Sequence, residues 1–316
     1  MPVLHLDEED VQSILQWDDL IPAMERALLT FSTGRALQPV RNVLSIEEGK
    51  RYLGIMPAVT DEAMGLKLVS FYPANAAKSI PTHMAMILLF RPETGQPLAV
   101  MDGRLITEMR TAAVSAAVTN RVAGPASRIL AILGSGVQAK AHLAALKCVR
   151  NFEEIRLWSR TPEHARRFAE EHDAVAMDAE SAVRGADIIV TATNALEPIL
   201  RGEWLKPGAH VNAVGSPRPT WRELDDCAMG NKIIVDSREA ALKESGDVIL
   251  SKAEIYAEAG EIFAGIKPRP TNCTTIFKSV GIAIEDIVSA ELVLNKLCHD
   301  KAAHQKSHGN AANKRI

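Results

Sequence analysis

The chain has 316 residues, of which 47% are hydrophobic and 24% are charged, and its formal net charge is −3. Such a length and composition are typical of a globular protein with a large core, and two domains are the natural expectation. The near-neutral charge argues against attraction to nucleic acid or to an anionic membrane surface, so a small molecule is the expected partner.

The sequence predicts neither a secretory signal nor a membrane span. Residues 1–10 become acidic where a signal peptide needs a basic end and then an apolar stretch. The longest apolar run, residues 84–90, is far shorter than the roughly 20 residues that cross a bilayer. We therefore expect a cytoplasmic protein with no membrane partner.

The cysteines are predicted to have no chemical role. They lie far apart, without a CxxC pair or a histidine at metal-ligand spacing, and they are Cys148, Cys227, Cys273 and Cys298. We expect free thiols that behave as small buried hydrophobic side chains. No metal site is predicted.

The first third of the chain is expected to form a long helix followed by an antiparallel sheet. Apolar residues recur at three- and four-residue steps over residues 8–31, which is typical of an amphipathic helix. Short apolar or β-branched segments then predict strands at 40–45, 52–56, 65–71, 84–90 and 97–101. A second helix is expected to begin near Leu105.

From Arg128 the pattern changes to strands that alternate with helices, which indicates a parallel sheet. Strands are expected at 129–133, 155–158, 187–192, 210–214 and 232–236, with helices from Val137 and over 162–172. Residues 124–127 mark the domain boundary. The predicted fold class is α/β, with a Rossmann-type doubly wound parallel sheet in residues 124–283 and an α+β domain in residues 1–123. The polar residues 301–316 are expected to be a disordered tail.

The strand at 129–133 runs directly into a turn of the form G-x-G-x-x-A, whose residues are Gly134, Ser135, Gly136, Val137, Gln138 and Ala139. The first glycine permits the tight turn, the second lets backbone amides approach a pyrophosphate, and the alanine allows close packing of helix on strand. A structural strand-to-helix turn is the alternative. The position of the motif within an alternating β/α block favours dinucleotide binding.

The end of the next strand distinguishes the two nicotinamide cofactors. NAD-binding proteins carry an acidic residue there for the ribose hydroxyls, whereas this chain has Ser159, Arg160 and Thr161. An arginine and two hydroxyls suit the 2′-phosphate of NADPH, through charge-assisted hydrogen bonds of about 1.5–3 kcal/mol each. NADPH is therefore the expected cofactor, with NADH a weaker possibility; a solvated loop arginine is the alternative interpretation of Arg160.

Ligands of parallel sheets lie at the carboxyl ends of the strands. We therefore expect further residues after the later strands to flank the cofactor, and these are Thr191, Thr193, Val214, Ser216, Lys278, Ser279 and Gly281. A generic loop role is the alternative for each.

Sequence blocks spread over almost the whole chain, to about Leu297, resemble the ornithine cyclodeaminase/mu-crystallin family. In that family's order they are residues 38–41, 67–69, 101–103, 110–115, 134–139 and 277–281. Residues 206–215, 221–226 and 239–248 look most like the mu-crystallin branch, whose activity is ketimine reduction.

The resemblance implies a homodimer built through an N-terminal substrate-binding and dimerisation domain, with the active site in the cleft next to the Rossmann domain. It also implies that a helix at 284–298 returns to the first domain. Arg41, Lys67 and Arg110 match basic substrate-binding positions, and arginines suit a planar carboxylate. Lys67 is the first candidate for proton donor because burial in its strand would lower its pKa. His83 also matches a family position, although a structural histidine is an equal alternative.

One departure from the family decides between two reactions. Cyclodeaminases carry an acid/base aspartate approximately where this chain has Pro217, and proline cannot transfer a proton. The resemblance therefore implies NADPH-dependent reduction of cyclic imino acids, namely Δ1-piperideine-2-carboxylate or Δ1-pyrroline-2-carboxylate to L-pipecolate or L-proline. An amino-acid dehydrogenase acting on a 2-oxo acid plus an amine is one alternative, and a structural or thyroid-hormone-binding protein is another.

Overall fold

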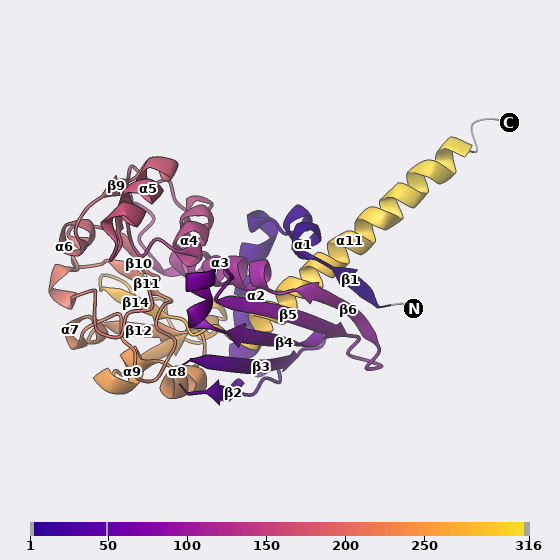
Figure 1. The fold of residues 1–316 in the computed structure, drawn as a ribbon, viewed down its shortest axis with the longest axis horizontal. Coiled ribbons are helices and arrows are strands. Elements are labelled where there is room, and N and C mark those ends of the chain that lie inside the picture. Colours follow the sequence, from indigo (N-terminus) through magenta and orange to yellow (C-terminus); the bar gives the residue numbers. More distant parts are fainter. Residues whose placement is uncertain (1–2, 49, 313–316) are drawn as a thin grey trace.

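The computed structural model describes residues 3–48 and 50–312. The chain forms two β-sheets, one of six strands and one of eight, with α3 (Arg104–Val122) between them (Figure 1). In the described residues no helix combines the length and the apolar character that a bilayer-spanning helix requires.

The N-terminal domain is built on the six-stranded sheet, in the order β1-β6-β5-β4-β3-β2. Its strands are β1 (Leu4–Leu6), β2 (Asn42–Glu47), β3 (Arg51–Val59), β4 (Met64–Phe71), β5 (His83–Phe90) and β6 (Pro97–Asp102), all antiparallel except for the β1–β6 pair. A 3₁₀ helix, η1 (Pro73–Lys78), lies between β4 and β5. Alternation along β5 buries Ala85 and Ile87 while Met84 and Met86 face outward, as expected for a sheet with one covered face.

The covered face packs against helices from both ends of the chain. α3 and α11 (Ala283–Ala312) lie on it, α2 (Trp17–Ser32) packs against these two helices, and α1 (Glu8–Ile14) lies at the edge of the sheet. Alanines fill much of α3, which is almost wholly buried, and small side chains let neighbouring helices approach closely. The chain crosses between the domains twice, at residues 123–128 and again at 279–282, and α11 then returns to the first domain (Figure 1).

The second domain is an eight-stranded, all-parallel sheet in the order β13-β12-β14-β11-β10-β7-β8-β9. Its strands are β7 (Ile129–Leu133), β8 (Glu154–Trp158), β9 (Val175–Ala176), β10 (Ile188–Thr191), β11 (His210–Ala213), β12 (Lys232–Val235), β13 (Ile255–Glu258) and β14 (Thr275–Lys278). The helical segments between them are α4 (Val137–Lys147), α5 (Pro162–His172), α6 (Ala179–Val183), η2 (Gly202–Trp204), α7 (Asp226–Met229), α8 (Arg238–Glu244), α9 (Gly246–Ser251) and α10 (Ala259–Phe263). This confirms the predicted α/β fold class with a Rossmann-type sheet.

Three sequence expectations differ from the structure. The helix expected over 8–31 is broken at Leu15 and Gln16, because Asp18 and Asp19 begin a new helix whose N-terminal dipole favours acidic residues. The expected burial of the cysteines is wrong, since Cys148, Cys227 and Cys298 are exposed free thiols and Cys273 is half-buried. Disorder was expected from Lys301, whereas α11 continues to Ala312; residues 313–316 lie outside the described residues.

Candidate active site

Four ionisable side chains form a buried cluster beside the domain boundary. The Lys67 Nζ on β4 lies 2.7 Å from the Asp286 Oδ2 on α11, and the Arg110 Nε on α3 donates to the Asp286 Oδ1 at 3.0 Å. The Arg110 Nη1 donates to the Glu285 Oε2 at 2.6 Å. All four side chains are at most 4% exposed. We call Lys67, Arg110, Glu285 and Asp286 the buried ionic cluster.

The surroundings of Lys67 make it a titratable group near neutral pH. Burial lowers the pKa of Lys67 to about 7, because the ammonium loses hydration, and the positive charge of Arg110 lowers it further. The Asp286 carboxylate opposes the shift. A lysine held in this way exists in both protonation states around pH 7, which suits a group that donates a proton.

His83, at the start of β5, lies near this cluster. Burial lowers the pKa of His83 to about 4, and the positive charges of Lys67 and Arg110 contribute. The imidazole is therefore neutral at physiological pH, so it can donate or accept a hydrogen bond but adds no charge to the site.

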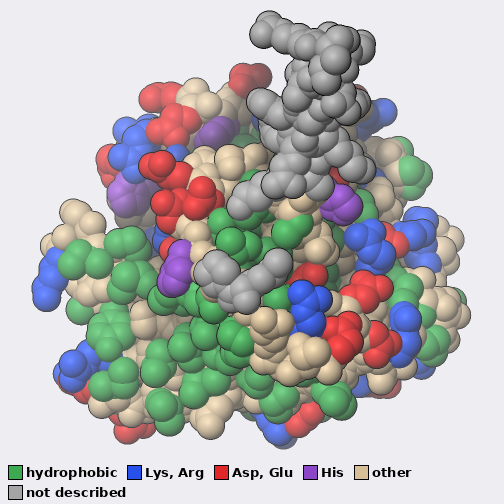
Figure 2. Space-filling view, turned by 90° about the vertical axis from the view of Figure 1, so that its right-hand side faces the viewer, with side chains coloured by type: hydrophobic (Ala, Val, Ile, Leu, Met, Phe, Trp, Pro, Cys, Tyr) green, Lys and Arg blue, Asp and Glu red, His purple; other side chains and the backbone are tan. Residues whose placement is uncertain are grey.

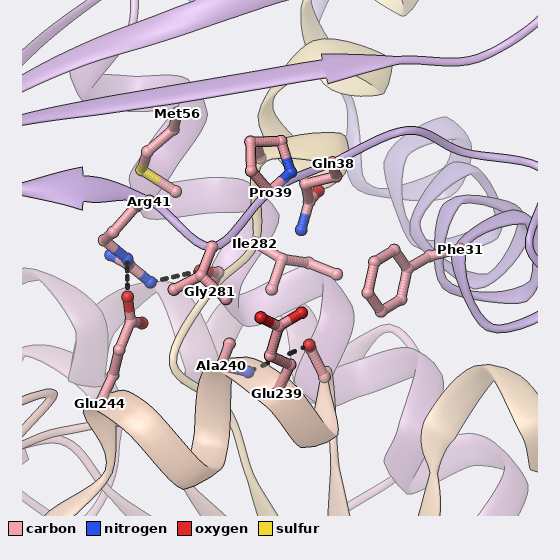
Figure 3. Close-up of a pocket in the computed structure, with 13 residues that line it drawn as sticks. Phe31, Gln38, Pro39, Arg41, Met56, Glu239, Ala240, Glu244, Gly281 and Ile282 are labelled. Atoms are coloured by element: carbon pink, nitrogen blue, oxygen red, sulfur yellow. Dashed lines mark hydrogen bonds and ion pairs between the residues drawn. The ribbon is translucent and has the colours of Figure 1, made fainter.

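Arg41 connects the two domains. Its Nη2 donates to the carbonyl oxygens of Val280 and Gly281, both at 2.6 Å, and its Nε lies 2.9 Å from the Glu244 Oε1 at the end of α8 (Figure 3). A pocket opens next to this contact, lined on one side by Gln38 and on the other by α8. Arg41 therefore lies at this pocket between the domains, close enough to the buried ionic cluster for its charge to act on Lys67.

The glycine turn after β7 has the features of a pyrophosphate site. Gly134 has a φ of +132°, and a Cβ there would lie 2.5 Å from the carbonyl oxygen of Ala192. Gly136 caps α4 without a side-chain hydrogen bond and faces open space, so the amides at this helix N-terminus are available to an anion. Ala139 is buried against the sheet. These residues fit a dinucleotide.

The end of β8 lies next to this turn. The hydroxyls of Ser135 and Ser159 are 2.9 Å apart, and Arg160 and Thr161 are exposed beside them. Val137, at the first position of α4, is 57% exposed, so the turn is open to solvent. The exposed Arg160 guanidinium has room for a phosphate.

Side chains at the ends of the later strands are engaged inside the protein. Glu223 accepts hydrogen bonds from the hydroxyls of Thr191 (2.8 Å) and Thr193 (2.7 Å) and from the amide of Gly215 (2.9 Å). The buried Lys278 Nζ lies 2.8 Å from the Asp247 Oδ2 and donates to the Gly215 carbonyl at 2.7 Å. These groups fix the loops around the cleft, and their side chains are not free for a ligand.

The remaining predicted residues are also held by internal bonds. The hydroxyl of Ser216 donates to the Ala195 carbonyl at 2.6 Å, and the amide of Val214 donates to the Thr191 carbonyl at 3.0 Å. Asp236 accepts from the hydroxyl of Ser279 at 2.9 Å and from the amide of Gly281 at 2.7 Å. A cofactor at these positions would therefore contact backbone atoms and not these side chains.

Sequence reasoning missed the acidic half of the site. Asp236 follows a buried strand, and Glu285 and Asp286 stand between apolar residues at the start of α11; acidic residues in such surroundings are the signal that was available. It also missed Arg218, whose guanidinium lies 3.9 Å from the ring centroid of Tyr52 and 5.5 Å from that of Phe71. Arg218 belongs to the second domain and the two rings to the first, so this stack joins the domains.

The chain is similar to known proteins over more than nine-tenths of its length. Ketimine reductase mu-crystallin of Mus musculus is 50% identical over 298 residues, covering 91% of this chain and 95% of that protein. The structure of Thermococcus litoralis Δ1-pyrroline-2-carboxylate reductase in complex with NADH and L-proline has a TM-score of 0.89 at 37% identity, covering 95% of this chain and 98% of that one. An archaeal alanine dehydrogenase dimer with bound NAD also has a TM-score of 0.89, at 32% identity and the same coverage.

The two-domain fold and the cleft between the domains, together with these similarities, define an oxidoreductase with a Rossmann-type domain. The model of the ornithine cyclodeaminase/mu-crystallin family matches residues 3–301. The chain belongs to this family.

Proposed function

We propose that the protein reduces cyclic imino acids to cyclic amino acids, with NADPH as the reductant. The observation that carries this proposal is the placement of Lys67 and Arg110 in the buried ionic cluster, beside the loop that follows β14, where a Cβ on Gly281 would lie 2.5 Å from the Arg110 Nη1. A cation and a proton donor held together in a dry site suit a substrate with a carboxylate and a carbon–nitrogen double bond.

In this proposal Arg110 and Arg41 bind the substrate carboxylate and orient the ring. Lys67 donates a proton to the imine nitrogen, and the resulting iminium accepts hydride more readily than the neutral imine. NADPH, when bound at the Gly134–Ala139 turn, supplies the hydride. Lys67 serves as the donor because its pKa of about 7 leaves it partly protonated at neutral pH.

The choice of NADPH depends on the residues after β8. Arg160 is exposed next to Ser159 and Thr161, and no acidic residue stands among them to bind the ribose hydroxyls of NAD. Two similar structures support a nicotinamide cofactor without distinguishing NADPH from NADH. The Thermococcus litoralis reductase is in complex with NADH, and the archaeal alanine dehydrogenase has bound NAD.

A second candidate is an amino-acid dehydrogenase that uses a 2-oxo acid and ammonia, because the similarity to archaeal alanine dehydrogenase extends over 95% of this chain. An absorbance assay of NADPH oxidation separates the candidates. We expect faster turnover with Δ1-piperideine-2-carboxylate or Δ1-pyrroline-2-carboxylate than with pyruvate plus ammonia. A clear preference for pyruvate plus ammonia would overturn the proposed function.

We also propose a homodimer through the outer face of the N-terminal sheet. Large apolar side chains on this domain are 41–76% exposed, and they are Leu37, Val43, Leu44, Ile46, Met84 and Met86. Hydrophobic side chains gather on the side of the molecule that carries this domain (Figure 2). Exposed apolar patches of this kind mark interfaces. Sedimentation of the purified protein tests the proposal, and a monomer at micromolar concentration would contradict it.

A further inference from the structure

Glu285 takes no part in the reaction proposed above, yet it is completely buried next to Arg110. One carboxylate oxygen, Oε2, accepts from the Arg110 Nη1 at 2.6 Å. The other, Oε1, has no hydrogen-bond partner within the described residues. A buried carboxylate with one oxygen unpartnered is costly, whereas the protonated acid carries no charge to desolvate.

The charges around Arg110 leave no surplus for a substrate carboxylate. With Lys67 protonated, Lys67 and Arg110 supply two positive charges, and Asp286 and an ionised Glu285 supply two negative ones. Arg41, the other arginine of the proposed carboxylate site, is already balanced by Glu244. A substrate carboxylate would add a third negative charge to a site that water does not reach. Burial of an unbalanced charge costs roughly several kcal/mol of free energy.

Neutralisation of Glu285 restores the balance. Asp286 does not suit this role, since it lies between two cations; burial works against its ionisation, but Arg110 and Lys67 keep its pKa low. The Asp236 carboxylate is already engaged, since it accepts hydrogen bonds from Ser279 and from the amides of Val280 and Gly281. Glu285 is the remaining carboxyl of the buried site.

We infer that Glu285 is a neutral carboxylic acid whenever a substrate carboxylate occupies Arg110, so that substrate binding is linked to one proton on Glu285. This inference rests on the proposed function only in taking Arg110 as the site of the carboxylate. The linkage has a simple stoichiometry: an ionised Glu285 takes up one proton as one carboxylate binds, and no bond of the substrate changes.

The other ionisable groups around Glu285 agree with this assignment. Burial raises the pKa of Glu285 to about 8; Arg110 opposes the shift, and the negative charges of Asp236 and Asp286 add to it. On the facing strands, Lys67 has a pKa lowered to about 7 and His83 one lowered to about 4. Arg41 at the rim is paired with Glu244, so it does not compensate Glu285.

The test measures proton uptake when L-proline binds to the enzyme saturated with NADPH, a combination that cannot react. Calorimetric titrations in buffers of different ionisation enthalpy give the number of protons taken up. The titrations use Lys67→Arg, because a guanidinium keeps its positive charge at high pH and cannot take up the proton in place of Glu285. At about pH 9, where Glu285 in the free enzyme is mostly ionised, we expect close to one proton per L-proline. The affinity should fall about tenfold per pH unit above pH 8.

Two variants identify the group. When Glu285→Gln is added to Lys67→Arg, the uptake at about pH 9 should disappear, and the affinity should no longer fall above pH 8. Glu291→Gln makes the same change on the same helix, at a half-buried residue outside the buried ionic cluster, and should retain both effects. Equal proton uptake in Lys67→Arg with and without Glu285→Gln would overturn the inference.

A measurement on the wild type decides the matter if Glu285→Gln does not fold. L-proline affinity that is constant between about pH 7 and about pH 9.5 would contradict the linkage. Difference infrared spectroscopy should show the carbonyl band of a protonated carboxyl appearing when L-proline is added at about pH 9, and its absence would also contradict it. If L-proline binding takes up a proton but the enzyme reduces no cyclic imine, the proposed function is wrong and this inference stands. If the enzyme reduces cyclic imines but L-proline binding does not depend on pH, this inference is wrong and the proposed function stands.

Discussion

The Lys67 ammonium and the Asp286 carboxylate are 2.7 Å apart, with side chains that are 2% and 0% exposed. Asp286 also accepts a hydrogen bond from Arg110, so one carboxylate holds both cations in place. The same carboxylate limits how far burial lowers the pKa of Lys67. The position and the protonation of Lys67 therefore both depend on α11, although Lys67 itself lies on β4.

A replacement of Lys67 by another cation should remove the proton donor but keep the positive charge. Lys67→Arg retains a cation next to Asp286, but a guanidinium does not titrate near neutral pH. We expect kcat for cyclic imine reduction to fall about 10²- to 10⁴-fold, the usual contribution of a general acid. Steady-state assays with NADPH measure this. Lys296→Arg, at a half-buried lysine of α11 that is paired with Asp19, is the matched control. Turnover of Lys67→Arg close to the wild-type rate would exclude the donor role.

The rate of reduction should depend on pH through Lys67. Its pKa is lowered to about 7, so the ammonium form that donates the proton is present below this value and is lost above it. We expect kcat to be highest below pH 7 and to fall about tenfold per pH unit above it, until another step limits the rate. A kcat that rises between about pH 7 and about pH 9 would show that a group other than Lys67 supplies the proton.

Arg160 should determine the preference for NADPH. In Arg160→Ser the loss of a charge-assisted hydrogen bond to the 2′-phosphate, about 1.5–3 kcal/mol, should weaken NADPH binding about 10- to 100-fold. NADH binding should change little. Fluorescence titrations of both cofactors measure the two affinities, and Arg166→Ser on the exposed face of α5 serves as the control. An equal loss for NADH and NADPH would contradict this role.

Breaking the buried ionic cluster should destabilise the fold. Asp286→Asn leaves Lys67 and Arg110 without their shared carboxylate, and the loss of one partner of a buried pair costs about 3–5 kcal/mol. Asp226→Asn removes an exposed partner of Arg222 and should cost less than about 1 kcal/mol. Thermal unfolding of both variants makes the comparison. Similar unfolding midpoints would mean that the cluster adds little to stability.

The sequence was sufficient to predict the secondary-structure elements that show a clear pattern of apolar, glycine or proline residues within a few positions. β2 to β6 of the N-terminal sheet, the glycine turn after β7 and the start of α3 lie within a few residues of their expected positions. β1, β9, β13 and β14 were missed. β1 and β9 have only three and two residues, and β13 and β14 show neither a regular alternation nor a wholly apolar run.

The candidate site could be predicted only in part, for a physical reason. Lys67 and Arg110 stood out through their match to the family, but their partners Glu285 and Asp286 lie about 175 residues or more further along the chain. Pairings of this kind depend on how α11 packs against β4 and α3. The sequence also could not show which side chains bind other side chains. Thr191 and Lys278 were predicted to flank the cofactor, but in the fold they bind Glu223 and Asp247.

The double crossing of the chain between the domains restricts how the cleft can open. Two bodies joined by a single linker can twist and separate in many directions, whereas two short connections at residues 123–128 and 279–282 mainly allow rotation about the line through them. The second connection also carries the carbonyl groups that Arg41 binds. Entry of a ligand is therefore expected to rotate one domain relative to the other about this line, which passes next to the Arg41 contact.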